Sequence, residues 1–356
     1  MVKTSNTSIT AKKVGDIGVS VVMPVRNGGF YLRHSVNSIL NQCHEKLELL
    51  IVNDNSTDLA LEWLTSSNHD KRIRIIDSPG EGIIDALNFG IDSATHPVIA
   101  RMDCDDISQS SRLTTQLTYM VDNPNIDVIG STISLFKDHK EIGQGYKLYQ
   151  NWINSLCDQN SIANNIFIES PIAHPSAMFT KQMIQELGGY QDQGWPEDYD
   201  LWCRAYLKGM KFGKPQSNPL VQWRDHDQRT SRQDERYNQS SFLNCKAHYL
   251  SQFLHAKGVN QCSIWGAGRV GAKLHDLLEA NKLSISHFYD VNPKLLGTTK
   301  KGKPIHLISS NQTLTPPKPG QGVCIIAVGS RGAREKIQRF LQRNAWCIQE
   351  HYILAA

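Results

Sequence analysis

The chain has 356 residues, of which 40% are hydrophobic and 20% are charged, with a formal net charge of +4. This composition excludes an intrinsically disordered protein, and the length predicts two domains at roughly 100 to 200 residues each. The longest apolar runs, 19–25 and 323–328, are far shorter than the ~20 residues of a membrane-spanning helix, so we expect no transmembrane segment. Residues 1–17 lack the apolar stretch of a secretory signal, which predicts an N-terminal tail and a cytoplasmic protein.

Residues 18–102 alternate short β-rich runs with helical patterns. We expect strands at 19–24, 47–53, 72–76 and 98–102. Between them we expect helices near 31–41, 59–66 and 83–94. This alternation predicts an α/β fold with a mostly parallel sheet and helices on both faces. Polar clusters follow the expected strands at Asn27, Asp54 and Asp103, and ligands of such sheets bind beyond the carboxyl ends of the strands, so these clusters predict one cleft.

Residues 107–258 are less regular. We expect a helix at 112–122, a strand near 127–136 and a helix at 198–208, which complete a first domain of residues 18–258. A second domain, 259–356, begins with a strand at 262–265 and a glycine-rich turn. It holds 13 Lys and Arg against 5 Asp and Glu, a net charge of +8, which leaves −4 for residues 1–258. The basic residues are not interleaved with stacking aromatics, so nucleic-acid binding is not expected.

An acidic cluster follows the expected strand at 98–102. Asp103, Asp105 and Asp106 crowd one turn, where like charges are costly unless a cation neutralises them. Mn²⁺ or Mg²⁺ is a suitable partner, because hard cations prefer carboxylate oxygens and share their coordination shell with substrate phosphates. Capping of a helix by these aspartates is the alternative interpretation.

A second acidic pair, Glu197 and Asp198, stands at the start of an expected helix. A general base in a metal-phosphate cleft has this appearance, and so does a helix whose N-terminus favours anionic side chains. His226 follows about thirty residues later and offers an imidazole that can complete a metal shell. The eight cysteines form no CxxC pair, so we expect reduced thiols and no zinc site.

Taken together, these motifs resemble the family 2 glycosyltransferases of the GT-A fold, which are inverting, nucleotide-sugar-dependent enzymes. The resemblance covers about residues 18–232. The motifs that carry it are VSVVMPVRN from Val19, NDNSTD from Asn53, ARMDCDD from Ala100, HPSAMF from His174 and EDYDLW from Glu197.

The resemblance implies a role for each site residue. It places the nucleotide against Pro24, Arg26, Asn27, Asp54 and Asp103, with Arg26 at a position that is often aromatic in the family. It implies that Asp105, Asp103 and His226 hold the metal, that Asp198 is the catalytic base and that Glu197 supports it. Arg229 and Arg232 are candidate diphosphate contacts or surface arginines, and the acceptor residues are expected within 137–172.

The second domain carries a possible ligand turn of its own. Gly266, Gly268 and Gly271 follow an apolar strand and open a helix, the context of a dinucleotide-binding turn. Asp290 ends the next apolar run, 22 residues after Gly268, close to the spacing expected for a ribose-binding acid. This pattern predicts a small Rossmann-like fold, which either binds a nucleotide or serves as a scaffold for assembly or acceptor recognition.

The main hypothesis is therefore a metal-dependent glycosyltransferase that moves a sugar from a nucleoside diphosphate donor, with UDP favoured, to a saccharide or lipid-linked acceptor in cell-surface polysaccharide synthesis. Peripheral association with the inner face of the cell membrane and oligomer formation are compatible with the sequence. One alternative is a nucleotide-sugar-binding protein without turnover whose C-terminal domain senses a dinucleotide. A dehydrogenase built on the glycine turn is a second alternative, but it leaves the first 258 residues unexplained.

Overall fold

The computed structural model describes residues 12–67, 70–138, 140–318, 322–330 and 332–356, so most of the expected tail 1–17 lies outside the described residues. Residue contacts divide the chain into two compact units. The first unit consists of Met1–Ala163, Pro171–Gln193 and Asp200–Gln233. The second consists of Asn164–Ser170, Gly194–Tyr199 and Asp234–Ala356. The C-terminal unit thus includes two short segments from the middle of the chain.

A seven-stranded sheet forms the centre of the first unit, in the order β3-β2-β1-β4-β8-β6-β9. Strands β3, β2, β1 and β4 are parallel neighbours, whereas β8 is antiparallel to both β4 and β6. The strands are β1 (Val19–Val25), β2 (Leu47–Asn53), β3 (Ile73–Asp77), β4 (Val98–Arg101), β6 (Val128–Ile129), β8 (Met178–Thr180) and β9 (Phe212–Gly213). The mixed, mostly parallel sheet expected from the sequence is confirmed.

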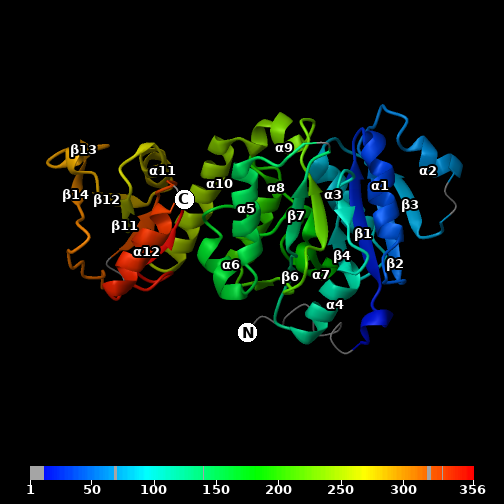
Figure 1. Cartoon of the computed structure of the whole chain (residues 1–356), viewed down its shortest axis with the longest axis horizontal. Helices are drawn as coiled ribbons and strands as arrows, with labels where there is room; N and C mark the ends of the chain where they lie inside the picture. The colour runs from blue at the N-terminus through cyan, green and yellow to red at the C-terminus, as the bar shows by residue number, and fades with distance from the viewer. Residues whose placement is uncertain (1–11, 68–69, 139, 319–321, 331) are drawn as a thin grey trace. The chain divides into compact units, whose positions relative to one another are not determined.

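Helices cover both faces of this sheet (Figure 1). Helix α1 (Gly29–Leu40) buries Leu32 and Val36 in the core that also contains Val21. Helix α3 (Ile83–Ser93) packs on the other face, because a Cβ on its Gly90 would lie 2.7 Å from a methyl of Val22, the next residue of β1. The remaining helices of the unit include α2 (Glu62–Ser67), α4 (Arg112–Asp122), α7 (Lys181–Glu186) and α9 (Thr230–Gln233).

A second, three-stranded sheet in the order β5-β10-β7 stands beside the acidic cluster. It consists of β5 (Ile107–Ser108), β10 (Val221–Arg224) and β7 (Ile133–Phe136). The single strand expected at 127–136 is therefore wrong, since β6 and β7 belong to different sheets. Strand β6 ends just before Gly130, where an added Cβ would lie 2.9 Å from the side chain of Ile172.

The segment 137–172, where acceptor residues were expected, contains two helices, α5 (Gln144–Ser155) and α6 (Gln159–Asn165). Helix α8 (Glu197–Leu207) begins in the C-terminal unit, and the division between the units falls after Tyr199. The first turn of α8 therefore belongs to a different unit from the rest of that helix.

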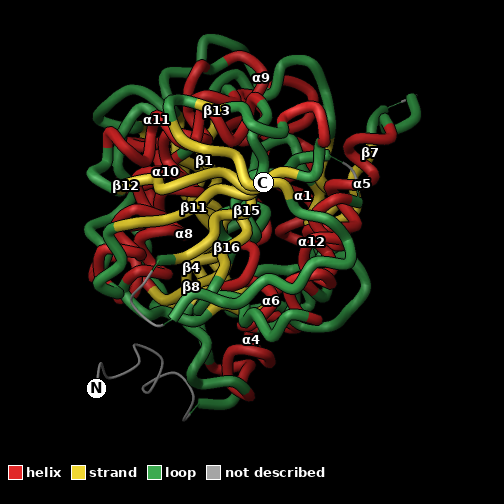
Figure 2. Tube along the Cα trace, turned by 90° about the vertical axis from the view of Figure 1, so that its left-hand side faces the viewer, coloured by secondary structure: helices red, strands yellow, loops and turns green. Residues whose placement is uncertain are grey.

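The C-terminal unit contains a six-stranded sheet in the order β13-β14-β12-β11-β15-β16. Strands β12, β11, β15 and β16 are parallel and lie side by side in Figure 2. This order, with β11 in the middle and the chain then moving to the opposite edge, is that of a Rossmann-like sheet. The strands are β11 (Gln261–Trp265), β12 (Ser284–Asp290), β13 (Thr299–Lys300), β14 (Lys303–Leu307), β15 (Val323–Ile326) and β16 (Tyr352–Leu354). The helices include α10 (Gln239–Ala256), α11 (Arg269–Ala280) and α12 (Ala333–Arg343).

Candidate functional site

The loop after β1 is braced by the loop after β2. Asn27 has a φ of 55°, and its side-chain Oδ1 accepts hydrogen bonds from the backbone N–H groups of Thr57 at 2.8 Å and Asp58 at 3.2 Å. The N–H of Asn27 in turn donates to Ser56 Oγ at 3.1 Å. Two of the polar clusters expected at one edge of the sheet are therefore brought together.

Asp54 and Arg26 lie at the same edge. Asp54 is buried, and its Oδ1 accepts from the N–H of Gly82 at 2.9 Å, which fixes the start of α3. The guanidinium of Arg26 lies 3.8 Å from Asp54 Oδ2 and donates to Glu81 at 3.0 Å. Pro24, the remaining residue expected near a nucleotide, pairs with Val52 in the sheet and is half-buried. These residues form a cluster with one exposed cation and one buried carboxylate.

The acidic cluster lies directly after β4. Oxygens of Asp103, Asp105 and Asp106 all lie within 4.8 Å of one another. His226, which follows β10, is brought to the same place, with its Nε2 2.7 Å from Asp105 Oδ2. Residues 121 positions apart in the chain therefore meet, as the sequence led us to expect for a metal site.

The three aspartates differ in their electrostatic environment. Burial opposes ionisation of Asp105, but the hydrogen bond from His226 and the charge of Arg229 outweigh it and lower the pKa of Asp105. Burial and the charge of Asp105 raise the pKa of Asp106 well above its ordinary value, and burial also raises that of Asp103. Asp106 Oδ2 is buried, and among the described residues it has no hydrogen-bond partner. Neighbouring carboxylates with a buried, unsatisfied oxygen fit a divalent cation, which would neutralise the repulsion between them.

Arg224, which the sequence did not indicate, joins the small sheet to this cluster. Its backbone N–H donates to Asp106 Oδ1 at 2.7 Å and its Nε donates to the carbonyl of Asp105 at 2.8 Å. The guanidinium lies between the rings of Tyr31 and Phe136, at 4.3 Å and 4.4 Å from their centroids. These groups border a pocket of about 470 Å³ lined by Phe30, Tyr31, His34, Ile107, Phe136, Asp138 and Arg224.

The two arginines after β10 have different partners. Arg232 forms ion pairs with Asp225 at 2.5 Å and Asp227 at 2.7 Å, so its charge is balanced by two nearby carboxylates. Arg229 stacks on the ring of Trp223 at 4.5 Å, and its charge acts on the aspartate cluster. Of the two candidates for a diphosphate contact, Arg229 is therefore the better placed.

The second acidic pair is in the C-terminal unit. Glu197 is 1% exposed, and its Oε2 accepts a hydrogen bond from the phenol of Tyr237 at 2.6 Å. Asp198 Oδ2 accepts from Ser170 Oγ at 3.3 Å, and its Oδ1 accepts from the N–H of Tyr199 at 2.7 Å. Their role as a catalytic pair acting with the aspartate cluster of the first unit stays a prediction.

The glycine turn of the C-terminal unit has the expected local structure. Gly266 has a φ of 113°, and a Cβ on Gly271 would lie 1.9 Å from the carbonyl oxygen of Gly266. A Cβ on Gly268 would meet nothing within 4 Å, so the backbone there can be approached by a ligand. Asp290 Oδ2 accepts from the N–H of Ala267 at 2.8 Å and Oδ1 accepts from Asn292 at 2.9 Å. The carboxylate expected to bind a ribose thus braces the turn itself.

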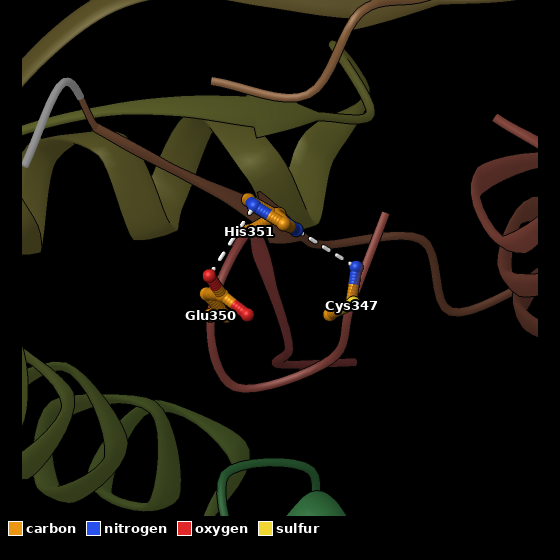
Figure 3. A group of neighbouring side chains, drawn as sticks. All are labelled: Cys347, Glu350 and His351. Atoms are coloured by element: carbon orange, nitrogen blue, oxygen red, sulfur yellow. Dashed lines mark hydrogen bonds and ion pairs between the residues drawn. The ribbon is translucent and has the colours of Figure 1, made fainter. Parts of the chain in front are cut away.

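A second group of metal-ligating side chains among the described residues is Cys347, Glu350 and His351 (Figure 3). His351 Nδ1 accepts a hydrogen bond from the N–H of Cys347 at 2.9 Å, and Nε2 lies 3.6 Å from Glu350 Oε1. A neutral imidazole has a single nitrogen lone pair, and here the backbone N–H uses it. We therefore interpret this exposed group as a hydrogen-bonded turn.

Burial shifts the pKa of two further residues of the sequence motifs. His174 is buried, burial lowers its pKa well below the ordinary value, and its Nε2 meets the Tyr190 hydroxyl at 2.8 Å. Burial raises the pKa of the Cys104 thiol well above its ordinary value, so that side chain is a neutral filler between the aspartates. The eight cysteines are free in the structure.

The family model for Glycosyl transferase family 2 matches residues 20–188, which contain the loops after β1 and β2 and the aspartate cluster. An uncharacterized glycosyltransferase of Haemophilus influenzae is 31% identical over 68% of this chain and 76% of its own length. The O-antigen biosynthesis glycosyltransferase WbnJ of Escherichia coli is 29% identical over 68% of this chain and 91% of its own length. The chain belongs to glycosyltransferase family 2.

Solved structures agree on the fold. TarS of S. aureus in complex with UDP matches 67% of this chain and 66% of its own, with a TM-score of 0.51 at 16% identity. The CoA binding domain model matches residues 259–351, in accordance with the Rossmann-like strand order of the C-terminal unit. The protein is thus a glycosyltransferase with a GT-A-like domain and a Rossmann-like C-terminal domain. Within the described part of the chain, every helix is too short or too polar to cross a bilayer.

Proposed function

We propose that this glycosyltransferase transfers a sugar from a UDP-sugar to a hydroxyl of a saccharide or lipid-linked acceptor in cell-surface polysaccharide synthesis, in the cytoplasm at the inner face of the cell membrane. The observation that carries the donor half of the proposal is the meeting of Asp105 and His226 beside Asp103 and Asp106. TarS binds UDP and WbnJ belongs to O-antigen synthesis, which support the donor and the pathway class.

In this reaction the acceptor oxygen forms a bond to the anomeric carbon while the bond from that carbon to the diphosphate breaks. Asp198 accepts the proton that the acceptor hydroxyl loses, a contribution of about 10²- to 10⁴-fold for general base catalysis. Asp105, Asp103 and His226 would hold Mn²⁺ or Mg²⁺, which neutralises negative charge on the leaving diphosphate when bound. Arg229 supplies a further positive charge beside the same aspartates. Attack from the side opposite the leaving group inverts the anomeric configuration.

The test is release of nucleoside diphosphate from a panel of UDP-sugars and other nucleotide sugars in the presence of Mn²⁺. We expect release to need the metal, to stop with EDTA and to fall about 10²- to 10³-fold in Asp105→Ala, the usual cost of removing one electrostatic group of an active site. Asp92→Asn, an exposed change on α3, serves as the matched control and should leave release unchanged. Tight, metal-dependent binding of a UDP-sugar without release would instead favour the alternative of a binding protein without turnover.

A further inference from the structure

A short hydrogen bond in the C-terminal unit has no role in the reaction steps described above. The phenol of Tyr237 donates to Glu197 Oε2 at 2.6 Å, and Glu197 is 1% exposed. Glu197 opens α8 next to Asp198, so two carboxylates follow each other in the first turn of that helix. Burial of one carboxylate beside another is unfavourable unless a donor stabilises the charge.

The segment around Tyr237 is held in place by its own contacts. Asp234 caps a short 3₁₀ turn by accepting from the N–H of Arg236 at 2.9 Å, and its carboxylate also pairs with the Arg236 guanidinium. Asn238 then caps α10 by accepting from the N–H of Ser241 at 2.9 Å. The phenol therefore approaches Glu197 from a segment that is capped on both sides.

The charged groups around this hydrogen bond determine the protonation state of the Tyr237 phenol. Burial raises the pKa of Tyr237 well above its ordinary value, and the charge of Glu197 adds to the effect, so the phenol stays a hydrogen-bond donor over the working pH range. The charged groups that act on Tyr237 are Glu197, Asp198 and Arg236.

Asp198 has a different set of neighbours. It accepts from Ser170 Oγ at 3.3 Å. Ser170 follows Glu169, whose pKa is raised by burial against the charge of Lys246. The phenol of Tyr237 thus donates a hydrogen bond to Glu197, whereas the hydroxyl of Ser170 donates one to Asp198.

We propose that Tyr237 is a positioning residue of the Glu197–Asp198 pair, which holds Glu197 as an ionised acceptor so that its charge keeps the neighbouring Asp198 basic. This inference rests on the proposed function, in which Asp198 accepts the proton of the acceptor hydroxyl. Two interacting carboxylates titrate as a pair, and the pair is fully ionised only above its higher apparent value. Removing the phenol removes the stabilisation of ionised Glu197, so the pair takes up its first proton at higher pH.

The test is the pH profile of nucleoside diphosphate release in Tyr237→Phe, measured with the UDP-sugar that the wild type uses. We expect the acid limb of kcat/KM to move up by ~1 pH unit, the scale of one charge-assisted hydrogen bond. Release should then fall roughly 10-fold at pH values on that limb and recover at alkaline pH. A loss of the same size at every pH, or no loss, would overturn the proposal, since a purely structural role does not move the limb.

Tyr199→Phe is the matched control. Tyr199 is also buried in the C-terminal unit, and its hydroxyl donates to a backbone carbonyl, that of Ile166 at 2.8 Å. This variant loses a buried hydrogen bond of similar length without removing a donor to a carboxylate. We expect it to lower the thermal midpoint and to leave the position of the acid limb unchanged. If Tyr199→Phe moved the acid limb of kcat/KM as far as Tyr237→Phe does, the position of the limb would depend on the stability of the fold and not on the hydrogen bond to Glu197.

A measurement without turnover separates this inference from the proposed function. Because the phenol stabilises the ionised form of Glu197, Tyr237→Phe should lower the thermal midpoint more at pH 8 than at pH 5. In a Glu197→Gln background, Tyr237→Phe should lower the thermal midpoint by the same amount at pH 8 and pH 5. If the pH-dependent cost appears but no nucleotide sugar is turned over, the hydrogen bond has its inferred effect and the proposed function fails. If turnover is normal but Tyr237→Phe lowers the thermal midpoint equally at both pH values, with Glu197 as well as with Gln at position 197, only the inference about Tyr237 fails.

Discussion

Three aspartates within four residues have three different partners. Asp105 meets His226, Asp106 accepts from the backbone of Arg224, and Asp103 pairs with Arg101. Asp105 thus remains ionised and faces an imidazole, whereas Asp106 joins the small sheet to the turn after β4. A cation at this site would be held by Asp105, Asp103 and His226, while the hydrogen bond from Arg224 to Asp106 fixes the turn that carries the aspartates.

Another buried carboxylate, Glu48 of β2, gives a prediction about stability. Burial alone would raise the pKa of Glu48, but hydrogen bonds from Ser20 and Thr95, with a further one from Arg74, lower it to about 2 from an ordinary value of 4.5. Because the folded-state pKa is the lower one, the stabilisation is present above about pH 4.5 and is lost as the pH falls towards 2. We expect Glu48→Gln to lower the free energy of unfolding by roughly 1–2 kcal/mol at pH 7, after allowance for solvent screening.

Urea unfolding at pH 7, pH 4 and pH 2.5 measures this dependence. The difference between Glu48→Gln and the wild type should shrink at each step. Glu62→Gln, an exposed change on α2, is the control and should have little effect at any of these pH values. A cost of Glu48→Gln that stays constant from pH 7 to pH 2.5 would contradict the assignment.

Among the helices and strands, the sequence predicts correctly those whose bounds depend on the local pattern of apolar and polar residues. The strands at 47–53 and the helix at 112–122 have the bounds that their apolar periodicity and flanking residues indicate. The run 127–136 was misassigned because its two halves pair with different distant strands, which no local pattern records. The site follows the same rule. The acidic motifs and Arg229 were visible in the sequence, but Arg224 and Tyr31 reach the cluster only through contacts between distant segments.

The turn between β11 and α11 gives a prediction at this scale. Gly271→Ala places a Cβ 1.9 Å from the Gly266 carbonyl oxygen, so the backbone must move, at a cost of about 1–3 kcal/mol. Gly268→Ala is the matched control, since its φ is −75° and the added Cβ meets nothing within 4 Å. Thermal unfolding should show a lower midpoint for Gly271→Ala and a near wild-type midpoint for Gly268→Ala. Equal midpoints for the two variants would show that the turn tolerates a side chain at both positions.

The same pair of variants tests whether the turn binds a phosphate-bearing ligand. Calorimetry with CoA and NAD⁺ on the full chain compares the wild type with Gly268→Ala, in which a methyl group occupies the space that a diphosphate would approach. If the C-terminal unit binds one of these ligands there, Gly268→Ala should weaken binding while keeping the fold. If none binds the wild type, the unit serves as a scaffold.

At the scale of the whole molecule, the compact units do not follow the order of the chain. The family match ends at residue 188, but Glu197, Asp198 and Tyr237 belong to the same unit as the Rossmann-like sheet. The sequence suggested a division at residue 258, because the net charge and the strand and helix pattern change there. The short segments 164–170 and 194–199 join the C-terminal unit, but nothing in their local sequence indicates this. The C-terminal unit therefore contains the proposed base and its positioning residue.

This arrangement predicts the effect of ending the chain after Gly258. Helix α10 would lose its partner α11, and the ammonium of Lys246, 8% exposed, would lose the carbonyl of Ala355 to which it donates at 2.7 Å. Removing an acceptor from a buried cation is costly, so α10 and the segment that carries Tyr237 should lose their order. The seven-stranded sheet lies entirely in the first unit and should keep its fold. We expect the truncated chain to retain Mn²⁺-dependent binding of UDP in calorimetry and to lose release of nucleoside diphosphate by at least ~10²-fold, the usual scale of general base catalysis. Retention of full turnover by residues 1–258 would show that the acidic pair needs nothing from residues 259–356. Loss of UDP binding would show that the first unit does not fold without those residues.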